Sequence, residues 1–589
     1  MSELATPPPT KASSGAPART VRRRGVRRAT SLFANGEPMV WLTGGALALA
    51  IAMIGGLLLL VISRGLPTFW PAQVLELETL DGQRVAGEVA AVDSYQPTPE
   101  VVNLLPEAAR DAANAKLAQD DGWSTRRMLR SGNYELTGTH FRWVSDFEIA
   151  AQSRPEWIAV VERLEWGRFY GTPIAVEFDG ERVSGDPAKV WEAFERAHGP
   201  AREVWSERRE LETHEIGREA KAKDDARLAV REAELEHGAQ SPQAARAAEL
   251  ALEVQRETDA RMEVLTQRVD ELRKRNEDRR VTLLTADGVE HSLALEQIVR
   301  AYPANRLGLT EKLGVYGSRV AEFIFGEPRE SNSEGGVFPA IFGTVLMTLI
   351  MAILVVPFGV LAALYLREYA RPGPIVSAVR IAINNLAGVP SIVFGVFGLG
   401  FFCYIVGANI DELLFAAKLP TPTYGKGGLI WASLTLALLT LPVVIVPTEE
   451  ALAAVPRSMR EGSYACGATK WQTIWRIVLP RAMPGIMTGM ILALARGAGE
   501  VAPLMLVGAS KLAAELPLDG TFPYLHPERS FMHLGFHIYD LGFQSQNSEA
   551  AKPLVYTTTL LLIALVVVLN LIAIGVRARL RRRFQGAQL

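Results

Sequence analysis

Cysteine is nearly absent from this sequence, which has 589 residues and only two thiols, Cys403 and Cys466. Cys403 lies within an apolar run and Cys466 within a polar connection. A disulfide framework or a cysteine-based zinc site needs several clustered thiols. The cysteine content therefore argues against both.

A phosphate-binding loop for nucleotides is also absent. No segment of the form Gly-x-x-x-x-Gly-Lys-Ser/Thr occurs, and the nearest fragment, Gly425-Lys426-Gly427, lacks the hydroxyl residue and the preceding glycine. We therefore expect no ATP hydrolysis by this chain, and we expect it to bind no cofactor.

Charge of one sign does not dominate either, because the formal net charge is −2. The distribution is more informative: charged residues concentrate in the first two thirds, and uncharged apolar runs fill most of the last third. The chain is too long for one compact domain. We predict a soluble part and a membrane part, with no sign of a nucleic-acid partner.

Six apolar runs are long enough to cross a membrane, which takes roughly 20 residues in a helix. The first run lacks a small-x-small cleavage site and is long for a signal peptide, so we interpret residues 38–64 as an uncleaved anchor. The six runs are 39–63, 338–366, 381–406, 427–447, 482–506 and 553–576.

Basic residues flank these runs on alternate connections. If all six runs cross, every basic cluster falls on one side, which is the cytoplasmic side by the positive-inside rule. Both termini are then cytoplasmic, and residues 65–334 form an extracytoplasmic insert. The clusters lie at Arg22–Arg28, Arg367–Arg380, Arg457–Arg481 and Arg577–Arg583.

The two ends of the chain are predicted to be tails. Residues 1–37, rich in Pro, Ala, Ser and Arg, read as a disordered basic tail. Its basic stretch suits contact with anionic lipid, although a pure topology signal is the simpler interpretation. Residues 584–589 form a short C-terminal tail.

Three Asp-Gly pairs lie between alternating segments of the insert, at Asp81-Gly82, Asp179-Gly180 and Asp287-Gly288. Asp-Gly is typical of a type I′ hairpin turn, which needs positive φ at both central residues. We predict an α+β insert that contains these three hairpins as a weak internal repeat.

A charged stretch, residues 189–279, is almost free of Gly and Pro except at 237–242. There Gly238 can end a helix, Ser241 can cap the next, and Pro242 suits its first turn. We predict a helical hairpin. Contact with a partner and a passive structural role remain equally open for this insert.

The connection 448–481 contains a spaced motif. Glu461, Gly462 and Ser463 are followed after three residues by Gly467, and after nine more by Ile477-Val478-Leu479-Pro480. This resembles the EAA loop of ABC importer permeases, with Gly462 and Ser463 in place of two alanines. The resemblance implies a short coupling helix that docks onto a separate ATPase and passes rigid-body motion to the spans.

Three further segments sharpen the resemblance. They are Gly335–Thr344, Asn384–Gly395 and Leu494–Leu504. Together with the loop they look like the A-type permeases of phosphate-specific ABC importers (PstA-like), in the long form with an extra domain after the first span. Val501 departs mildly, since many relatives have Thr there. The resemblance implies six helices with a type I importer permease core at residues 335–583.

Arg496 and Glu500 stand four residues apart in the fifth run, with Arg496 expected near its middle. A charge facing lipid is costly, so Arg496 must face protein or a water-filled path. A guanidinium offers bidentate donors to phosphate, and the resemblance implies importance for transport. A structural or gating pair with Glu500 is not exclusive of this role.

Asn384 and Asn385 are polar residues within the third predicted run, before the helix-breaking Gly388-Val389-Pro390. Freed backbone there could line a path. Hydrogen bonding between helices is at least as good an interpretation. His533 and His537 have the i, i+4 spacing of some metal sites but no third ligand, so we predict no metal site.

The resemblance implies a phosphate permease in the bacterial inner membrane, paired with a second permease, two ATPase subunits and a periplasmic phosphate-binding protein. Permeases for molybdate, sulfate or phosphonate remain an alternative. A membrane-anchored sensor or scaffold would leave the coupling loop unexplained, and a secondary carrier would need no ATPase.

Overall fold

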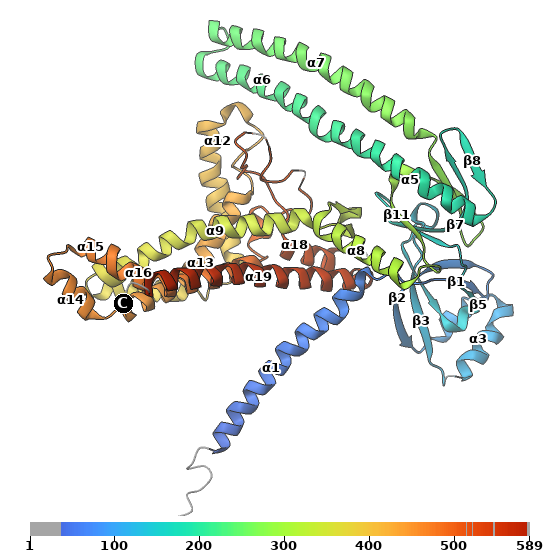
Figure 1. Ribbon diagram of the computed structural model, residues 1–589, viewed down its shortest axis with the longest axis horizontal. Coiled ribbons are helices and arrows are strands. Elements are labelled where there is room, and N and C mark those ends of the chain that lie inside the picture. Colours follow the sequence, from blue (N-terminus) through green and yellow to red (C-terminus); the bar gives the residue numbers. More distant parts are fainter. Residues whose placement is uncertain (1–36, 120, 514, 521, 546–547, 586–589) are drawn as a thin grey trace, which may run out of the picture. The chain divides into compact units, whose positions relative to one another are not determined.

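The computed structural model describes residues 37–119, 121–513, 515–520, 522–545 and 548–585. The chain forms two compact units, residues 1–60 and 61–589 (Figure 1). The first unit contributes most of helix α1 (Glu37–Gly65). The predicted tails and the basic cluster at Arg22–Arg28 fall almost wholly outside the described residues.

Six helices in the described ranges are long and apolar enough to span a membrane, as predicted. Two of them, the third and the fifth, start or end several residues away from the predicted positions. The spans are Met39–Phe69, Phe338–Tyr369, Ser391–Leu414, Leu429–Ala453, Lys470–Gly499 and Ala551–Arg579.

The third span begins later than predicted. A separate helix, α10 (Pro374–Leu386), precedes it, and the span starts at Ser391 with α11 (Ser391–Phe397), η7 (Gly398–Gly407) and α12 (Ala408–Leu414). Pro390 is the cause: proline disfavours helical backbone in the residue before it and has no N–H to donate. Apolar residues continue through the break at Pro390. Hydropathy alone therefore predicted one helix where the structure has two.

The fifth span is also displaced. It begins with α15 (Lys470–Thr473) and η9 (Ile474–Val478) and continues as α16 (Leu479–Gly499), whereas the sequence estimate ran from residue 482 to 506. Pro503 and the extended backbone of Glu500 end the helix early. The following apolar residues form the short helix α17 (Leu504–Val507).

The membrane part is built around α13 (Leu429–Ala454), whose apolar window is 67% buried, against 6% for the first and last spans. It packs between α9 (Phe338–Leu364) and α16. Glycine permits this closeness: a Cβ on Gly359 would lie 2.7 Å from a methyl of Val444. α18 (Leu534–Tyr539) and α19 (Ser548–Gln585) complete this part.

The insert contains two antiparallel sheets with the same topology. In sequence order the first module runs β1 to β5, and its strands lie in the order β4-β3-β2-β1-β5; the second lies in the order β10-β9-β7-β6-β11. A 3₁₀ turn precedes the last strand of each. The strands are β1 (Val74–Thr79), β2 (Arg84–Tyr95), β3 (Ser124–Arg130), β4 (Phe141–Ser145), β5 (Ile149–Ser153), β6 (Ala159–Arg163), β7 (Arg168–Phe178), β8 (Glu181–Ser184), β9 (Arg280–Leu284), β10 (Glu290–Ala294) and β11 (Ile298–Pro303).

The two modules also share register. Glu78 pairs with Arg84 in the first, and Glu162 with Arg168 at the equivalent position of the second. Both second strands are bulged opposite the third strand at matching places. The modules differ in the connection that follows the second strand. In the first module it contains α2 (Pro99–Asn103) and α3 (Glu107–Gln119), and in the second it contains β8 and a long helical arm.

All three Asp-Gly pairs lie in hairpins, as predicted. The predicted turn type is right only at Asp179-Gly180, where both residues have positive φ. In the other two turns only the glycine has positive φ, because a threonine two residues before the aspartate hydrogen-bonds it from its hydroxyl and closes a wider loop. The Asp-Gly hairpins also occupy different positions in the two modules. The structural repeat is therefore the shared strand topology and not the Asp-Gly pairs.

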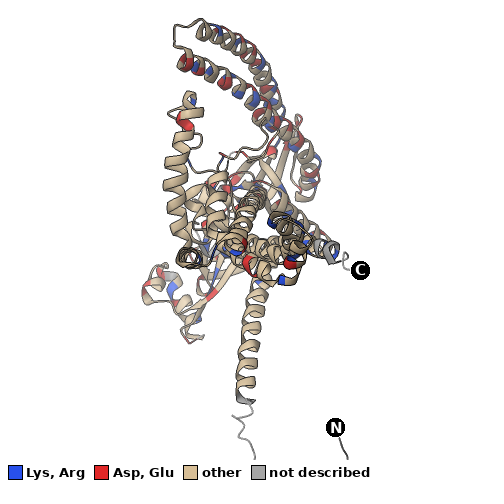
Figure 2. Cartoon of the chain, turned by 90° about the vertical axis from the view of Figure 1, so that its left-hand side faces the viewer, with Lys and Arg blue, Asp and Glu red and all other residues tan. Residues whose placement is uncertain are grey.

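The helical arm consists of α5 (Pro187–Glu210), η3 (Leu211–Glu215), α6 (Ile216–His237) and α7 (Pro242–Glu277). Its fold-back matches the prediction: Gly238 has φ +89°, and the Ser241 hydroxyl accepts from the Ala244 N–H at 3.1 Å. Charged residues of both signs occur all along α6 and α7, whereas the spans consist almost entirely of uncharged residues (Figure 2).

A buried ion network connects the second module to α8 (Leu309–Phe325), the helix that leads toward α9. The Glu162 carboxylate accepts hydrogen bonds from Arg300 and Arg319, and Arg168 bonds Glu88. Burial raises the pKa of Glu162 and of Glu88, but the neighbouring guanidinium groups outweigh it and hold both below the ordinary value.

Candidate functional site

The predicted coupling segment forms a short helix, α14 (Arg457–Ala465). It follows α13 after the break at Val455-Pro456 and precedes the start of the fifth span at Lys470. α13 itself continues to Ala454, so the residues from 448 to 454 belong to the span helix rather than to a loop.

Gly467 ends this helix with two hydrogen bonds. Its own N–H donates to the carbonyl of Tyr464 at 2.9 Å, and the Ala468 N–H donates to the carbonyl of Ser463 at 3.1 Å. This pair is a Schellman motif, which needs left-handed backbone, and Gly467 has φ +82°. The sequence prediction that Gly467 turns the chain is therefore confirmed.

The outer face of α14 is open. Glu461 and Gly462 are exposed, and a Cβ on Gly462 would meet nothing within 4 Å. Ser463 is half-buried and its hydroxyl lies 2.8 Å from that of Thr473, which joins α14 to the base of the fifth span. A small, flat helical face of this kind leaves room for a close partner backbone.

Leu479 and Pro480 begin α16 and are half-buried. Pro480 directly follows the π-helical turn η9 inside the continuous fifth span, where its missing N–H interrupts the helical hydrogen-bond ladder. Leu479 packs against an apolar cluster under the loop that includes Leu452, Val455 and Ile474.

Sequence reasoning missed an ion pair beneath this loop. An Arg460 guanidinium nitrogen lies 2.8 Å from a carboxylate oxygen of Glu368, in η6 (Tyr365–Tyr369) directly after α9. The two residues are 92 positions apart, and Glu368 follows a span with nothing in its local pattern to mark it.

The predicted Arg496–Glu500 pair is present, with the Arg496 Nε 3.4 Å from the nearest carboxylate oxygen. The predicted depth is wrong: Arg496 lies in the last turn of α16, and Glu500 is the extended residue that caps it. The side chains are 35% and 20% exposed in the isolated chain. Both therefore remain accessible at the end of the fifth span.

Asn384 and Asn385 are not inside a span. They lie near the end of α10, are exposed, and precede the turn that leads to α11. Leu386 and Val389, immediately after them, pack against the same apolar cluster as Leu494 of α16. The turn that they precede and the last turns of α16 thus border one cluster.

His533 and His537 are buried, and burial lowers the pKa of each to about 4. Among the residues that the structure describes, no group of three His, Cys, Asp or Glu side chains could hold a metal ion.

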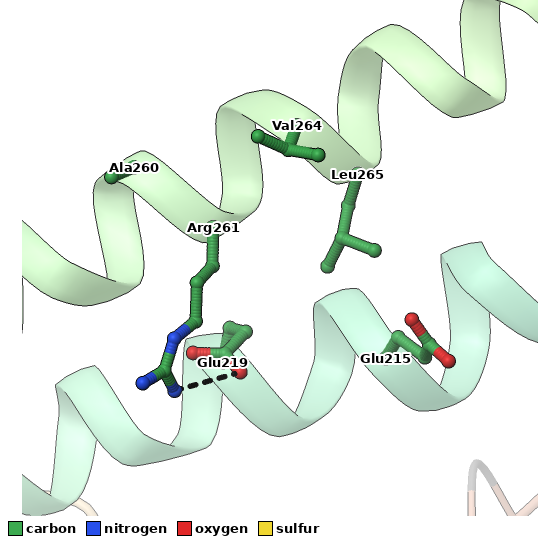
Figure 3. Close-up of a pocket in the computed structure, with 6 residues that line it drawn as sticks. All are labelled: Glu215, Glu219, Ala260, Arg261, Val264 and Leu265. Carbon is green, nitrogen blue, oxygen red and sulfur yellow. Dashed lines mark ion pairs between the residues drawn. The ribbon is translucent and has the colours of Figure 1, made fainter.

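A hollow of about 460 Å³ lies on the arm, away from the predicted site residues. Arg261 of α7 reaches across it to Glu219 of α6, at 3.6 Å, beside the apolar side chains of Val264 and Leu265 (Figure 3). Nothing in this hollow connects it to the motifs of the membrane part.

Residues 355–586 match the family described as binding-protein-dependent transport system inner membrane component. Over 257 residues the chain is 38% identical to the phosphate transport system permease protein PstA of Mycobacterium leprae, covering 43% of this chain and 74% of that protein. The chain belongs to the PstA family. It is also 42% identical over 177 residues to PstA 1 of Mycobacterium tuberculosis (strain CDC 1551 / Oshkosh), covering 30% of this chain and 52% of that relative.

The family match begins after the insert, so residues 65–334 lie outside it. Among solved structures, a chain of the MetNI methionine ABC transporter in an inward-facing conformation aligns with a TM-score of 0.30 at 21% identity, over 42% of this chain and 94% of that one. A TM-score this low supports no argument about this PstA-family member.

Proposed function

We propose that this chain is a permease subunit of an ATP-driven phosphate importer. The observation that carries the proposal is the 38% identity to a phosphate transport permease over 74% of that relative's length. The segments Asn384–Gly395 and Leu494–Leu504, which first pointed to this family, lie within the matched region.

The proposed complex contains a second permease, two ATPase subunits and a periplasmic phosphate-binding protein, with this chain forming half of the path. The open face of α14 supports docking of an ATPase, because Glu461 and Gly462 present a small surface that none of the described residues covers. The proposal places α14 and both termini in the cytoplasm, since the basic clusters flank α14 and the last span.

Arg496 is the residue proposed to act on the anion. Its side chain lies in the last turn of the fifth span and is 35% exposed, and its Nε lies 3.4 Å from a carboxylate oxygen of Glu500. A planar guanidinium can exchange a carboxylate for a phosphate oxygen with little change in geometry. The pair would then open when phosphate passes and close behind it.

Uptake of radiolabelled phosphate at low external concentration tests this function, in cells that lack the native gene but keep its partners. The parent chain should restore uptake. Arg496→Ala and Glu461→Lys should each reduce it by at least about tenfold, or about 1.4 kcal/mol in barrier. Arg371→Ala, which removes an exposed arginine outside the site, is the matched control.

Membrane insertion of every variant is checked by immunoblot. No uptake by a correctly inserted parent would refute phosphate transport. Competition with molybdate, sulfate and phosphonate separates the oxyanions, and stronger inhibition by one of these than by phosphate would reassign the substrate.

A further inference from the structure

Glu368 lies at a junction of helices that the motif does not include. It follows α9 directly, in the π-helical turn η6, and its side chain is 10% exposed. Its partner Arg460 belongs to α14 and is 16% exposed. The pair therefore joins the end of the second span to the helix proposed to meet the ATPase.

Arg460 makes two further bonds at this junction. It donates to the carbonyl of Val455 at 2.6 Å and to that of Leu452 at 2.9 Å. These carbonyls belong to the last turns of α13 and the break after it, where helix carbonyls lack internal partners. One guanidinium thus connects three elements, α9, α13 and α14, which the single ammonium of a lysine could not do with the same geometry.

A second cation reinforces the same turn. Lys470, the first residue of the fifth span, donates to the backbone carbonyl of Glu368, and its ammonium lies 4.6 Å from the centre of the Tyr369 ring. The end of α9 is therefore held on two sides, once from α14 and once from the base of the fifth span.

Stability alone does not explain this arrangement. The surroundings are apolar, including Leu364, Leu452 and Val455, and a buried ion pair rarely stabilises a fold more than apolar packing of the same volume. An ion pair does fix relative position, because charge-assisted hydrogen bonds are directional and a guanidinium is planar.

We propose that Glu368 and Arg460 are positioning residues that transmit movement of α14 to α9. The inference rests on the proposed function, in which α14 moves with the ATPase. When α14 shifts, the guanidinium pulls the end of α9 with it, and α9 carries the shift along the second span. Without the pair, α14 would still bind its partner, but α9 would follow it incompletely.

The neighbouring pair Arg380–Glu449 does not have these features. Its atoms are 3.4 Å apart, and Arg380 is 44% exposed. Solvent screens such a pair, so it fixes position weakly. Of these two pairs, Arg460–Glu368 is therefore the firm ionic connection and Arg380–Glu449 the loose one.

The test uses the complete importer reconstituted in proteoliposomes, with inorganic phosphate as the transported anion. The ratio of phosphate moved to ATP hydrolysed is measured for the parent, Glu368→Gln, Arg460→Lys and the control Arg371→Gln. Docking is followed separately by cross-linking the exposed native thiol of Cys466 to the ATPase. Cys403 is buried and does not interfere.

Glu368→Gln should reduce phosphate moved per ATP by about tenfold, the usual size of a lost charge-assisted bond, with cross-linking unchanged. Arg460→Lys should reduce it less, and Arg371→Gln should not change it. Glu368→Asp, which keeps the charge on a shorter side chain, should fall between the parent and Glu368→Gln.

An assembled Glu368→Gln importer with the parent's ratio would overturn the inference. If that variant does not assemble, Glu368→Asp and Arg460→Lys decide by the same ratio, and failure of all three to assemble would make the pair a folding element and also overturn the inference. A parent importer that moves no phosphate would instead refute the proposed function.

Discussion

The two β modules of the insert place the same ion pair in opposite environments. In the first module Glu78 and Arg84 are 42% and 54% exposed, with 3.6 Å between them. In the second, Glu162 and Arg168 are 5% and 16% exposed at the same separation. Strand order, register and bulges are shared, so this pair differs between the modules in what covers it rather than in how its strands pair.

The element that covers the Glu162–Arg168 pair is α8, through the side chain of Arg319. Arg319 of this helix is 5% exposed and bonds Glu162, and Arg300 of the last strand completes the shell. The two modules therefore share their strand topology. How much a residue contributes to stability depends instead on the element that packs over it. The exposed pair Glu78–Arg84 contributes little to stability, whereas losing one partner of the buried pair Glu162–Arg168 is costly.

The largest effect should come from Glu162→Gln. This change leaves Arg168, Arg300 and Arg319 without their shared carboxylate in a buried site, and should lower the unfolding free energy by about 3–5 kcal/mol. Tryptophan fluorescence during thermal unfolding of the detergent-solubilised chain measures it, since most of the 11 tryptophans lie in residues 65–334.

The matched control is Glu78→Gln, the equivalent change in the first module. Its exposed pair should contribute less than about 0.5 kcal/mol. Equal losses in the two variants would show that burial by α8 does not distinguish the modules.

Acid should first weaken the buried ion network that joins Glu88 of the first module to the second module and α8. Folding lowers the pKa of Glu162 and Glu88 below the unfolded value of 4.5, so their contribution is present above pH 4.5 and is lost as pH falls below it. The unfolding temperature of the parent should therefore drop steeply below that pH. Glu162→Gln, which has already lost the contribution, should show a shallower drop, and parallel curves would contradict this explanation.

The shared glycines offer a smaller test. Gly87 and Gly171 hold equivalent positions in the second strands, but a Cβ on Gly87 would lie 2.3 Å from the Arg130 carbonyl oxygen. On Gly171 the nearest atom, the Leu283 Cβ, would be 3.0 Å away. Gly87→Ala should destabilise by about 2–3 kcal/mol and Gly171→Ala by about 1, measured by the same unfolding assay. The reverse order would mean that the modules relax differently than their backbones indicate.

An effect as small as that of Gly171→Ala should come from Ser145→Ala. Ser145 precedes the 3₁₀ turn of the first module and its hydroxyl lies 2.8 Å from that of Tyr95, whereas the second module has Ala294 there. The loss should be about 1 kcal/mol. Ser153→Ala, at an exposed strand end, is the control and should change nothing measurable.

Local patterns predicted local structure well. The six spans follow from hydropathy, the arm's turn from Gly238, Ser241 and Pro242, and the end of α14 from Gly467, because each depends on a few neighbouring residues. The true repeat escaped detection because paired strands need only compatible faces: Leu75 of the first module corresponds to Ala159 of the second. The arm also separates the halves of the second module.

The candidate site was likewise predictable where it depends on local spacing, and not where it depends on helix ends or on distant partners. The spacing of Arg496 and Glu500 predicted their pairing, but hydropathy could not place the end of α16, so the mid-span position was wrong. For the same reason, the prediction that Asn384 and Asn385 lie inside a span was wrong. Glu368 could not be found at all, since its partner is distant in sequence and only the packed helices bring the two together.

The buried hydroxyls of α13 bear on how the chain enters the membrane during synthesis. Ser433, Thr435, Thr440 and Thr448 each donate to a carbonyl four residues back in their own helix. These polar atoms are satisfied before any neighbouring helix arrives. The most buried span can thus enter lipid on its own before it packs against α9 and before α16 has been made.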